Sequence, residues 1–407
     1  MSLKPMSMTT RKEYLTSIYK RYRFSTRKEK VAILDEFCLS TGYRRKYAIR
    51  LLNAPLCLTP PVYQGKRETY TNEDIYYLKK IWDVLDYPCG QRLAPMLPEM
   101  MSVLERCDEL TVPEEVAVRL RKMSAPTIDR RLVHLKRAAI RKIHGTTKPG
   151  SLLKKQIPIV LSRWNEKRPG YTELDLVAHC GMNAAGDFVS TLNMTDLATA
   201  WSEEEAILGK AQKRVIFAIN QIDRRLPFKL LGIDPDNGSE FINWQLYTYC
   251  LARKIEFTRG RPGKKNDNAH IEQKNWTHVR KIVGYQRLET QAQADLLNRL
   301  YRGPVRLYMN FFQPVMKLVK KERIGGRLKR QYDTPKTPYQ RVLEHPAISP
   351  VTKKQLTALY QTLNPVSLKR EIEQGIAVLP KAAAQRKTPH TKVTFSMIER
   401  MPVKLHF

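Results

Sequence analysis

Hydrophobic and polar positions change their spacing along this chain in three blocks. Between 9 and 145, apolar residues recur at helical spacing, most clearly over 26–37, 43–52, 72–85 and 97–106. From 171 to about 300, short apolar runs of strand length alternate with helical patterns. Past 312, short β-like pieces rich in Pro, Gly, Lys and Arg lead into a basic tail. The pattern predicts a multidomain α/β protein.

The middle block predicts the elements of a sheet covered by helices. Strands are expected at 172–179, 188–193, 228–233 and 255–258, and helices at 210–225, 244–253, 269–283 and 290–312. A loop rich in Gly, Pro and Lys is expected at 259–267.

Two regions of the first block have the outline of a helix-turn-helix, in which a second, basic helix follows a short turn. Gly42 separates the helices of the first region, and Ser124 or Ala125 caps a basic helix in the second. A solvated basic helix in a small bundle explains either region alone, but the recurrence favours sequence-specific DNA binding. The candidate DNA contacts are Arg44, Arg45, Lys46, Arg50, Thr127, Arg130 and Arg131.

The charge balance points in the same direction. Lys and Arg total 72 against 39 for Asp and Glu, which gives a net charge of +33. Such an excess fits a polyanionic partner, usually nucleic acid. A membrane surface is the weaker alternative, because no apolar run reaches the roughly 18 residues that span a bilayer. We expect no membrane partner and an intracellular location.

Three acidic residues lie in contexts that need an explanation. Asp175 lies inside an apolar strand, Asp236 ends another apolar run, and Glu272 lies on the helix after the loop. A carboxylate in an apolar strand is costly unless it is paired or bound to metal. Each acid alone fits an ordinary turn or surface position, but together they can converge at one face of a sheet. Glu173, two residues before Asp175, shares its face and could modulate the site or contact a neighbouring cation.

Three converging carboxylates repel one another, and Mg²⁺ or Mn²⁺ would resolve that repulsion. Two such ions about 3.5–4 Å apart can stabilise the attacking and leaving oxygens of a displacement at phosphorus. We therefore expect two metal ions at Asp175, Asp236 and Glu272, and a reaction on phosphodiesters.

The local motifs resemble a known superfamily. Sixty residues separate Asp175 from Asp236, and thirty-five separate Asp236 from Glu272. The sequences DNGSEF around Asp236 and NDNAHIEQKN around Glu272 look like the second and third acidic motifs of the retroviral-integrase superfamily. Within it, the chain resembles bacterial insertion-sequence transposases more than the retroviral enzymes. The resemblance implies an RNase H-like catalytic core, Mg²⁺-dependent hydrolysis at element ends, and joining of the 3′-OH to target DNA.

The chain also departs from that superfamily. The retroviral zinc module of two His and two Cys is absent. Many relatives carry a basic residue four or seven positions after the glutamate, where this chain has Trp276 and Val279. Cations nearby are the candidate clamps for the DNA backbone: Arg259, Arg261, Lys264, Lys265, Lys274 and Lys281.

These observations predict the domain order and function. We expect helix-turn-helix modules at 1–60 and 61–150, an RNase H-like mixed-sheet core at 160–300, a small basic β-rich domain at 312–370 and a basic tail at 371–407. The leading hypothesis is a transposase acting on double-stranded DNA as at least a homodimer, in the bacterial cytoplasm at the nucleoid. A catalytically silent DNA-binding regulator and a nuclease without strand transfer are the alternatives.

Overall fold

Three helices form the N-terminal unit of the computed structural model, which describes residues 6–56, 70–136, 168–236, 238–259, 271, 274–324, 327–380 and 382. They are α1 (Met8–Phe24), α2 (Arg27–Thr41) and α3 (Arg45–Asn53). Phe37 of α2 and Leu52 of α3 are fully buried between them. Gly42 ends α2 in the left-handed conformation, at φ 71°, which glycine adopts without strain. The two helices and the turn predicted here are therefore present, whereas α1 was not predicted.

The second unit, Tyr70–Phe407, begins with the helices α4 (Asn72–Val84), α5 (Gly90–Arg106), α6 (Glu114–Arg121) and α7 (Ala125–Lys136). Helix α5 begins seven residues before the predicted start at 97 and includes Pro95 and Pro98. Its first residue, Gly90, lies against α7: an added Cβ would lie 2.2 Å from the Ala125 carbonyl oxygen. Only glycine allows the two helix starts to pass at this distance.

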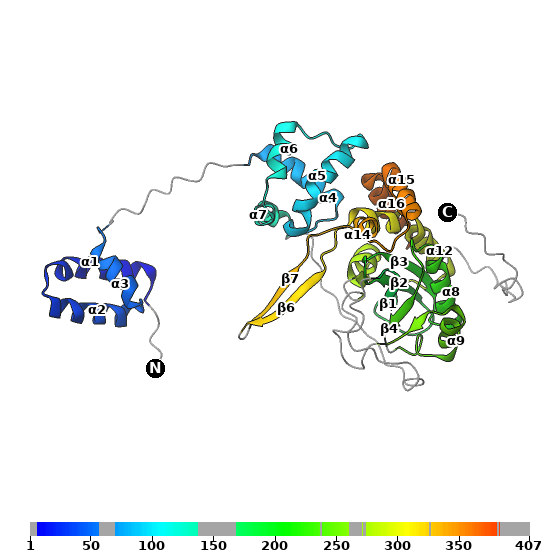
Figure 1. Ribbon diagram of the computed structural model, residues 1–407, viewed down its shortest axis with the longest axis horizontal. Helices are drawn as coiled ribbons and strands as arrows, with labels where there is room; N and C mark the ends of the chain where they lie inside the picture. The colour runs from blue at the N-terminus through cyan, green and yellow to red at the C-terminus, as the bar shows by residue number, and fades with distance from the viewer. Residues whose placement is uncertain are drawn as a thin grey trace, which may run out of the picture. The chain divides into compact units, whose positions relative to one another are not determined.

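A mixed sheet of five strands, counted over the described residues, forms the centre of the second unit (Figure 1). The strands are β1 (Tyr171–Ala178), β2 (Val189–Asp196), β3 (Ser202–Leu208), β4 (Gly232–Pro235) and β5 (Glu256–Phe257). Their order is β3-β2-β1-β4-β5, with β1 to β3 antiparallel and β4 and β5 parallel to β1. Helices α8 (Gln212–Asp223) and α9 (Trp244–Arg253) run alongside the sheet. This is the mixed, helix-flanked sheet that the resemblance implied.

The edge of β3 is covered by two asparagine side chains from later helices. Asn298 donates to the carbonyl oxygen of Ala206 (2.9 Å) and accepts from its amide (2.6 Å). Asn310 makes the same pair of bonds with Ser202, at 2.8 and 2.9 Å. These amides take the place of a neighbouring strand, so this edge is not left free for another chain.

The segment predicted as one helix over 290–312 is instead three pieces. They are α12 (Gln291–Leu300), the π-helix η2 (Tyr301–Val305) and α13 (Arg306–Phe312). Gly303 has non-helical backbone angles and Pro304 follows it, so the helical hydrogen bonding is interrupted there. The prediction of a continuous helix was wrong at this point.

The prediction of a β-rich domain over 312–370 also differs from the structure. One hairpin, β6 (Leu318–Ile324) and β7 (Arg327–Tyr332), is followed by the helices α14 (Pro338–Glu344), α15 (Pro350–Thr362) and α16 (Pro365–Val378). Each of these helices has Pro in its first turn after a Thr, Ser or Asn cap, which is a strong helix start.

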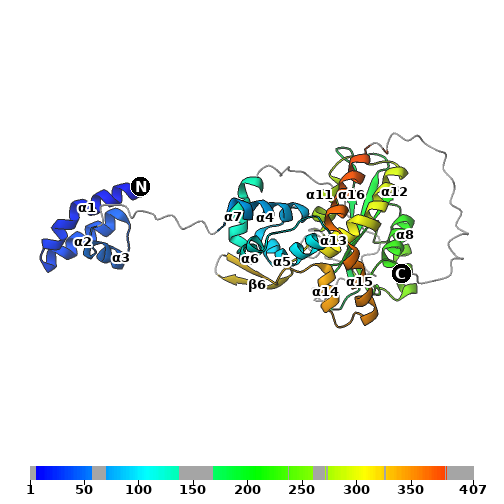
Figure 2. The same cartoon turned by 90° about the horizontal axis from the view of Figure 1, so that it is seen from above.

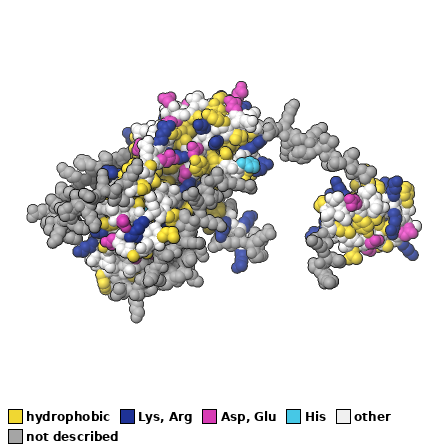
Figure 3. All heavy atoms as spheres, turned by 180° about the vertical axis from the view of Figure 1, so that it is seen from behind, with side chains coloured by type: hydrophobic (Ala, Val, Ile, Leu, Met, Phe, Trp, Pro, Cys, Tyr) yellow, Lys and Arg dark blue, Asp and Glu magenta, His cyan; other side chains and the backbone are white. Residues whose placement is uncertain are grey.

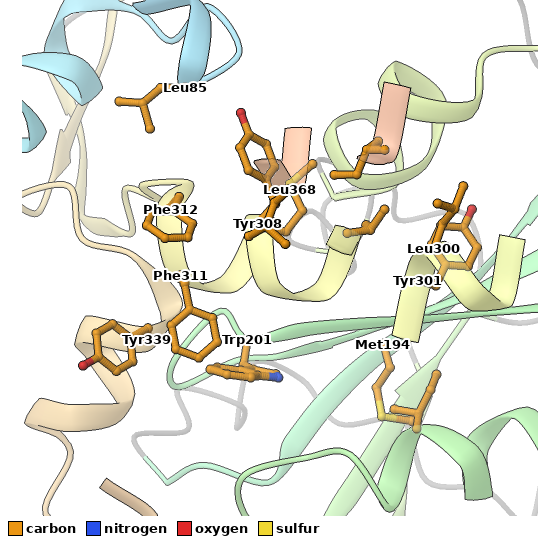
Figure 4. Close-up of a cluster of buried hydrophobic side chains, with 14 of the residues drawn as sticks. Leu85, Met194, Trp201, Leu300, Tyr301, Tyr308, Phe311, Phe312, Tyr339 and Leu368 are labelled. Atoms are coloured by element: carbon orange, nitrogen blue, oxygen red, sulfur yellow. The ribbon is translucent and has the colours of Figure 1, made fainter. Parts of the chain in front are cut away.

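Aromatic side chains of α13 join the sheet to these C-terminal helices. Phe311 packs on Trp201 and on Tyr339 (Figure 4). Phe312 contacts Tyr360. Glu99 of α5 accepts from Gln340 of α14 (2.6 Å) and from Tyr360 of α15 (2.5 Å). Helices α5, α13, α14 and α15 therefore lie together, as Figure 2 shows. No helix in the described part of the chain is both long and apolar enough to cross a membrane.

Candidate active site

Two of the three predicted acids lie close together: Asp175 is on β1, and Asp236 directly follows the parallel strand β4. The pairing of β1 with β4 runs from Tyr171 and Gly232 to Leu174 and Pro235. The next residues in this register are Asp175 and Asp236, and both side chains are partly buried. The strand pairing itself brings these carboxylates together, although sixty residues separate them.

Both oxygens of the Asp175 carboxylate have hydrogen-bond donors. The Leu176 amide donates to Oδ1 (2.7 Å), and the Asn275 side-chain amide donates to Oδ2 (2.6 Å). Burial raises the pKa of Asp175 to about 7, and the charges of Asp236 and Glu240 add to that rise. The two donors act in the opposite direction. The ionised pair is therefore strained electrostatically until a proton or a cation neutralises it.

Asp236 is held by the turn that follows β4. The Gly238 amide donates to its Oδ1 (2.9 Å). Burial raises the pKa of Asp236, and Glu240 raises it further, while Lys210 has the opposite effect. Glu240 also lies 3.9 Å from Lys210. A Cβ added at Gly238 would lie 2.7 Å from the Glu240 carboxyl carbon and 3.0 Å from Asp236 Oδ1, so glycine gives the two acids room here.

The third predicted acid, Glu272, lies outside the described residues, but the residue before it is fixed. The Ile271 amide donates to Glu173 Oε2 at 2.9 Å, and both residues are buried. Glu173 was predicted to modulate the site or to meet a cation. It holds the backbone one residue before Glu272 on the same strand that carries Asp175.

A row of polar side chains crosses the sheet from Asp175. Asp175 pairs with Asn193 of β2, and Asn193 pairs with Glu204 of β3. Asn275 bridges the first two: it accepts from Asn193 (2.9 Å) and donates to Asp175. His278 Nδ1 lies 2.9 Å from Glu204 Oε1. Asn275 and His278, which lie on one helical stretch, therefore form hydrogen bonds with side chains of the three adjacent strands β1, β2 and β3.

That stretch is a π-helix, η1 (Asn275–Arg280), followed by α11 (Lys281–Val283). Such wide turns are rare and occur often at functional sites. Lys274 Nζ lies 3.1 Å from His278 Nε2, so the ammonium donates there and His278 Nδ1 donates to Glu204. Burial raises the pKa of Glu204 to about 7 and lowers that of His278 well below its usual value.

The predicted DNA contacts of the N-terminal unit have different surroundings. Arg44, Lys46 and Arg50 are exposed on α3 or at its start. The Arg50 guanidinium lies 5.0 Å from the centre of the Tyr47 ring. Arg45 forms an ion pair with Asp35 of α2. Of the predicted DNA contacts in the N-terminal unit, Arg44, Lys46 and Arg50 are therefore the ones that are exposed and carry no ion pair in the described residues.

The predicted contacts elsewhere range from buried to exposed. Lys274 is buried, and Lys281 forms an ion pair with Asp86 at 2.5 Å. Arg259 is also buried. On α7, Arg130 donates to Thr127 (3.1 Å), and Arg131 is partly buried. Arg261, Lys264 and Lys265 lie outside the described residues. Lys274 has His278 and Lys281 has Asp86 as a partner within the protein, and their contact with DNA stays a prediction.

Sequence reasoning missed Asn275, Asn193 and Glu240 near the acid pair. Asn275 follows Glu272 by three residues, which is a same-face spacing on a helix and could have identified it. Nothing in the sequence connects Asn193 to Asp175, because strand register alone brings them together.

Within the described residues, no group of three metal-binding side chains is found. The donors that do meet there, Asp175 and Asp236, are oxygen ligands of the kind that Mg²⁺ and Mn²⁺ prefer.

Comparison with known proteins identifies a relative of this chain. No family model matches the sequence. It is 40% identical over 337 residues to the uncharacterized protein y4rM of Sinorhizobium fredii, covering 83% of this chain and 96% of y4rM. The catalytic core domain of BIV integrase matches with TM-score 0.28 and 15% identity, over 47% of this chain and 98% of that one. The magnesium complex of the HTLV-2 integrase catalytic core domain matches with TM-score 0.27 and 14% identity, over 36% and 90%. Structural scores this low carry no argument on their own, whereas the sequence match does: the chain belongs to the family of y4rM.

Proposed function

We propose that this chain is a DNA transposase that cuts at the ends of a mobile element and joins the freed 3′-OH to target DNA. The observation that carries the proposal is the Asp175–Asp236 pair: both acids directly follow the last register pair of β1 and β4, Leu174 with Pro235, and the charge of Asp236 raises the pKa of Asp175. Ile271, the residue before the third acid, is bonded to Glu173 of the same strand as Asp175. A domain without metal chemistry has no need to hold such a repelling pair together.

Asp175, Asp236 and Glu272 would hold two Mg²⁺ or Mn²⁺ ions. The three side chains suit these ions because all their donor atoms are carboxylate oxygens. The raised pKa values of Asp175 and Asp236 also show that their negative charges need neutralising. When bound, the ions would stabilise charge on the attacking and leaving oxygens of an in-line displacement at phosphorus.

The residues around the acids orient them. Asn275 donates to one oxygen of Asp175, and the Gly238 amide donates to one oxygen of Asp236. Donors of this kind fix the direction in which the remaining lone pairs point, as outer partners of metal ligands do. Glu173 fixes the backbone before Glu272. Such positioning matters because a misplacement of about 1 Å can cost about 100-fold in rate.

Two successive displacements account for the proposed activity. In the first, water attacks a phosphodiester at the element end, and the P–O3′ bond breaks to leave a 3′-OH and a 5′-phosphate. In the second, that 3′-OH attacks a target phosphodiester, one P–O bond forms, and another breaks to release a new 3′-OH. The number of phosphodiester bonds is kept in the second step, so it needs no nucleotide cofactor.

Binding of the element ends is assigned to the N-terminal unit. Helix α3 follows α2 after the Gly42 turn and exposes Arg44, Lys46 and Arg50, the outline of a recognition helix. Transposition joins two ends, so at least two copies of the chain would act together. The net charge of +33 suits a protein that works on chromosomal DNA.

The test is a cleavage and strand-transfer assay with Mg²⁺ on DNA that flanks the coding sequence. Asp175→Asn and Glu272→Gln are expected to lose both nicked and joined products, because each removes one metal-binding charge. Asp187→Asn is the matched control, since it neutralises an exposed acid that is not one of the three. It is expected to keep activity.

The other outcomes separate the alternatives. Nicked DNA without joined products would identify a nuclease that does not transfer strands. Specific binding of the ends with no product from the wild type would favour the DNA-binding regulator. Equal activity of the wild type and Glu272→Gln would exclude the three-acid site.

A further inference from the structure

We propose that the β6–β7 hairpin is a DNA-binding arm that lies in a groove of duplex DNA between the two phosphate backbones. The inference rests on the proposed function only in taking DNA as the partner. It concerns residues other than the acid pair and helix α3.

The hairpin projects from the second unit as an isolated two-stranded ribbon (Figure 1). Exposed apolar side chains stand at its base: Val319 is 65% exposed, Leu318 43% and Tyr332 42%. A lone two-stranded hairpin is marginally stable in water. A long ribbon that packs so little of its own surface is expected to meet a partner.

The charges of the hairpin identify that partner. Lys320, Arg323, Lys329 and Arg330 are exposed, and the one acid among these strands, Glu322, forms an ion pair with Lys320 (2.6 Å). In the space-filling view, dark blue Lys and Arg side chains stand on the projecting arm (Figure 3). A second copy of this chain, at +33, is a poor counterion for such a surface, whereas a phosphate backbone is a good one.

The cations lie on both faces of the ribbon. Arg323 pairs with Leu328, and Glu322 pairs with Lys329. Because side chains alternate along a strand, Arg323 and Arg330 share one face, and Lys320 and Lys329 share the other. Cations on both faces suit a ribbon with phosphates on either side. A two-stranded ribbon fits the major groove, which is about 12 Å wide, and β6 is about 20 Å long at roughly 3.3 Å per residue.

The base of the hairpin is fixed to the sheet. Lys317 Nζ donates to the carbonyl oxygens of Leu197 (2.5 Å) and Ala198 (2.7 Å), between β2 and β3. Asp333 accepts from the Lys317 amide (2.7 Å) and forms an ion pair with Arg341 of α14 (2.7 Å). DNA held by the arm would therefore be held in a defined position relative to the sheet that carries Asp175.

The test measures the affinity for a labelled, mixed-sequence duplex in EDTA, by fluorescence anisotropy, from about 50 to about 200 mM salt. The variant combines Arg323→Gln, Lys329→Gln and Arg330→Gln. All three side chains are exposed, so the fold is expected to be kept, and circular dichroism checks it. The control removes the same charge elsewhere with Arg299→Gln, Lys353→Gln and Lys354→Gln. A second variant, Arg323→Lys with Arg330→Lys, keeps the charge.

Loss of three phosphate contacts is expected to reduce the slope of log affinity against log salt by about 2 to 3, and to weaken binding at least about tenfold. The control and the charge-keeping variant are expected to keep the wild-type slope. Equal slopes in the hairpin variant and the control would overturn the proposal. So would unchanged DNA affinity with a smaller oligomer in light scattering, which would make the hairpin a subunit contact.

Failure of this proposal and failure of the proposed function give different results. Binding in EDTA to an arbitrary duplex does not depend on cleavage by Asp175, Asp236 and Glu272. If the wild type cuts no DNA but the hairpin variant binds DNA more weakly than the wild type, the result supports the DNA-binding arm and contradicts the transposase proposal. If the wild type joins strands and the hairpin variant keeps the wild-type salt slope, the result supports the transposase proposal and contradicts the DNA-binding arm.

Discussion

Neutralising Asp175 is expected to stabilise the metal-free protein while it abolishes activity. The pKa of Asp175 is raised from 3.8 to about 7, chiefly by burial and then by the charge of Asp236. At about 1.36 kcal/mol per unit of pKa, ionisation of this side chain costs the folded state about 4 kcal/mol. Asparagine keeps one acceptor but loses the second hydrogen bond, at about 1 kcal/mol. The expected gain for Asp175→Asn is therefore about 3 kcal/mol.

The sign of this effect depends on pH. Because the folded pKa lies above the unfolded value, the cost is absent below about pH 4, appears between about 4 and 7, and is complete above about 7. Urea unfolding in EDTA, followed by tryptophan fluorescence, is expected to show a larger gain for Asp175→Asn at about pH 8 than at about pH 5. The exposed Asp187→Asn is the matched control and is expected to show neither effect. A variant no more stable than the wild type at the higher pH would refute the electrostatic reasoning.

Three further changes test the surroundings of the acids. Asn275→Ala removes a donor that lowers the pKa of Asp175, so Mn²⁺ affinity measured by calorimetry is expected to fall about tenfold; unchanged affinity would exclude this role. Glu173→Leu removes the acceptor for the Ile271 amide while Glu173→Gln keeps one, so the Leu variant alone is expected to lose kcat with little change in KM; equal kcat in the two would contradict it. Arg225→Met removes one of the two arginines paired with each of the buried Glu203 and Glu205 and is expected to cost about 3 kcal/mol in urea unfolding, against little change for the exposed Arg224→Met.

Elements with a regular hydrophobic pattern were predicted well from the sequence. Helix α9 begins and ends at the predicted residues, Trp244 and Arg253, and β1 differs from its prediction by one residue at each end. Both have an apolar pattern that local sequence alone can show. The mixed sheet and its flanking helices follow from such elements, as the resemblance implied.

Strand β3 could not be predicted in this way. Its sequence, SEEEAIL, places three consecutive glutamates in a buried strand. Glu203 and Glu205 form ion pairs with Arg225, and Arg306 and Arg302 complete the two sets. These arginines lie 20 or more residues away in the sequence. Hydropathy assigns such a run to the surface, because the charges that make its burial possible are brought there only by the fold.

The candidate site shows the same limit. The acid pair was predicted because Asp175 lies inside an apolar run and Asp236 ends another, which are local signals. Lys274 and Lys281 were predicted to contact DNA because they are cations near Glu272, and within the protein they have His278 and Asp86 as partners; their contact with DNA stays a prediction. Charge in the sequence shows that a cation is present, but only the packing shows whether it is already paired.

The polar row from Asp175 through Asn193 to Glu204 explains why these buried carboxyl groups keep a fixed position although their burial is unfavourable. Burial raises the pKa of both carboxyls to about 7, so the protein gains no stability from their burial. Each is instead bonded to the same helical stretch, Asp175 through Asn275 and Glu204 through His278. Because a slip of that stretch by one residue would break both bonds at once, the row fixes its register on the sheet. Glu272 precedes that stretch by three residues in the sequence, so the polar row fixes the register of the segment that follows the third predicted acid.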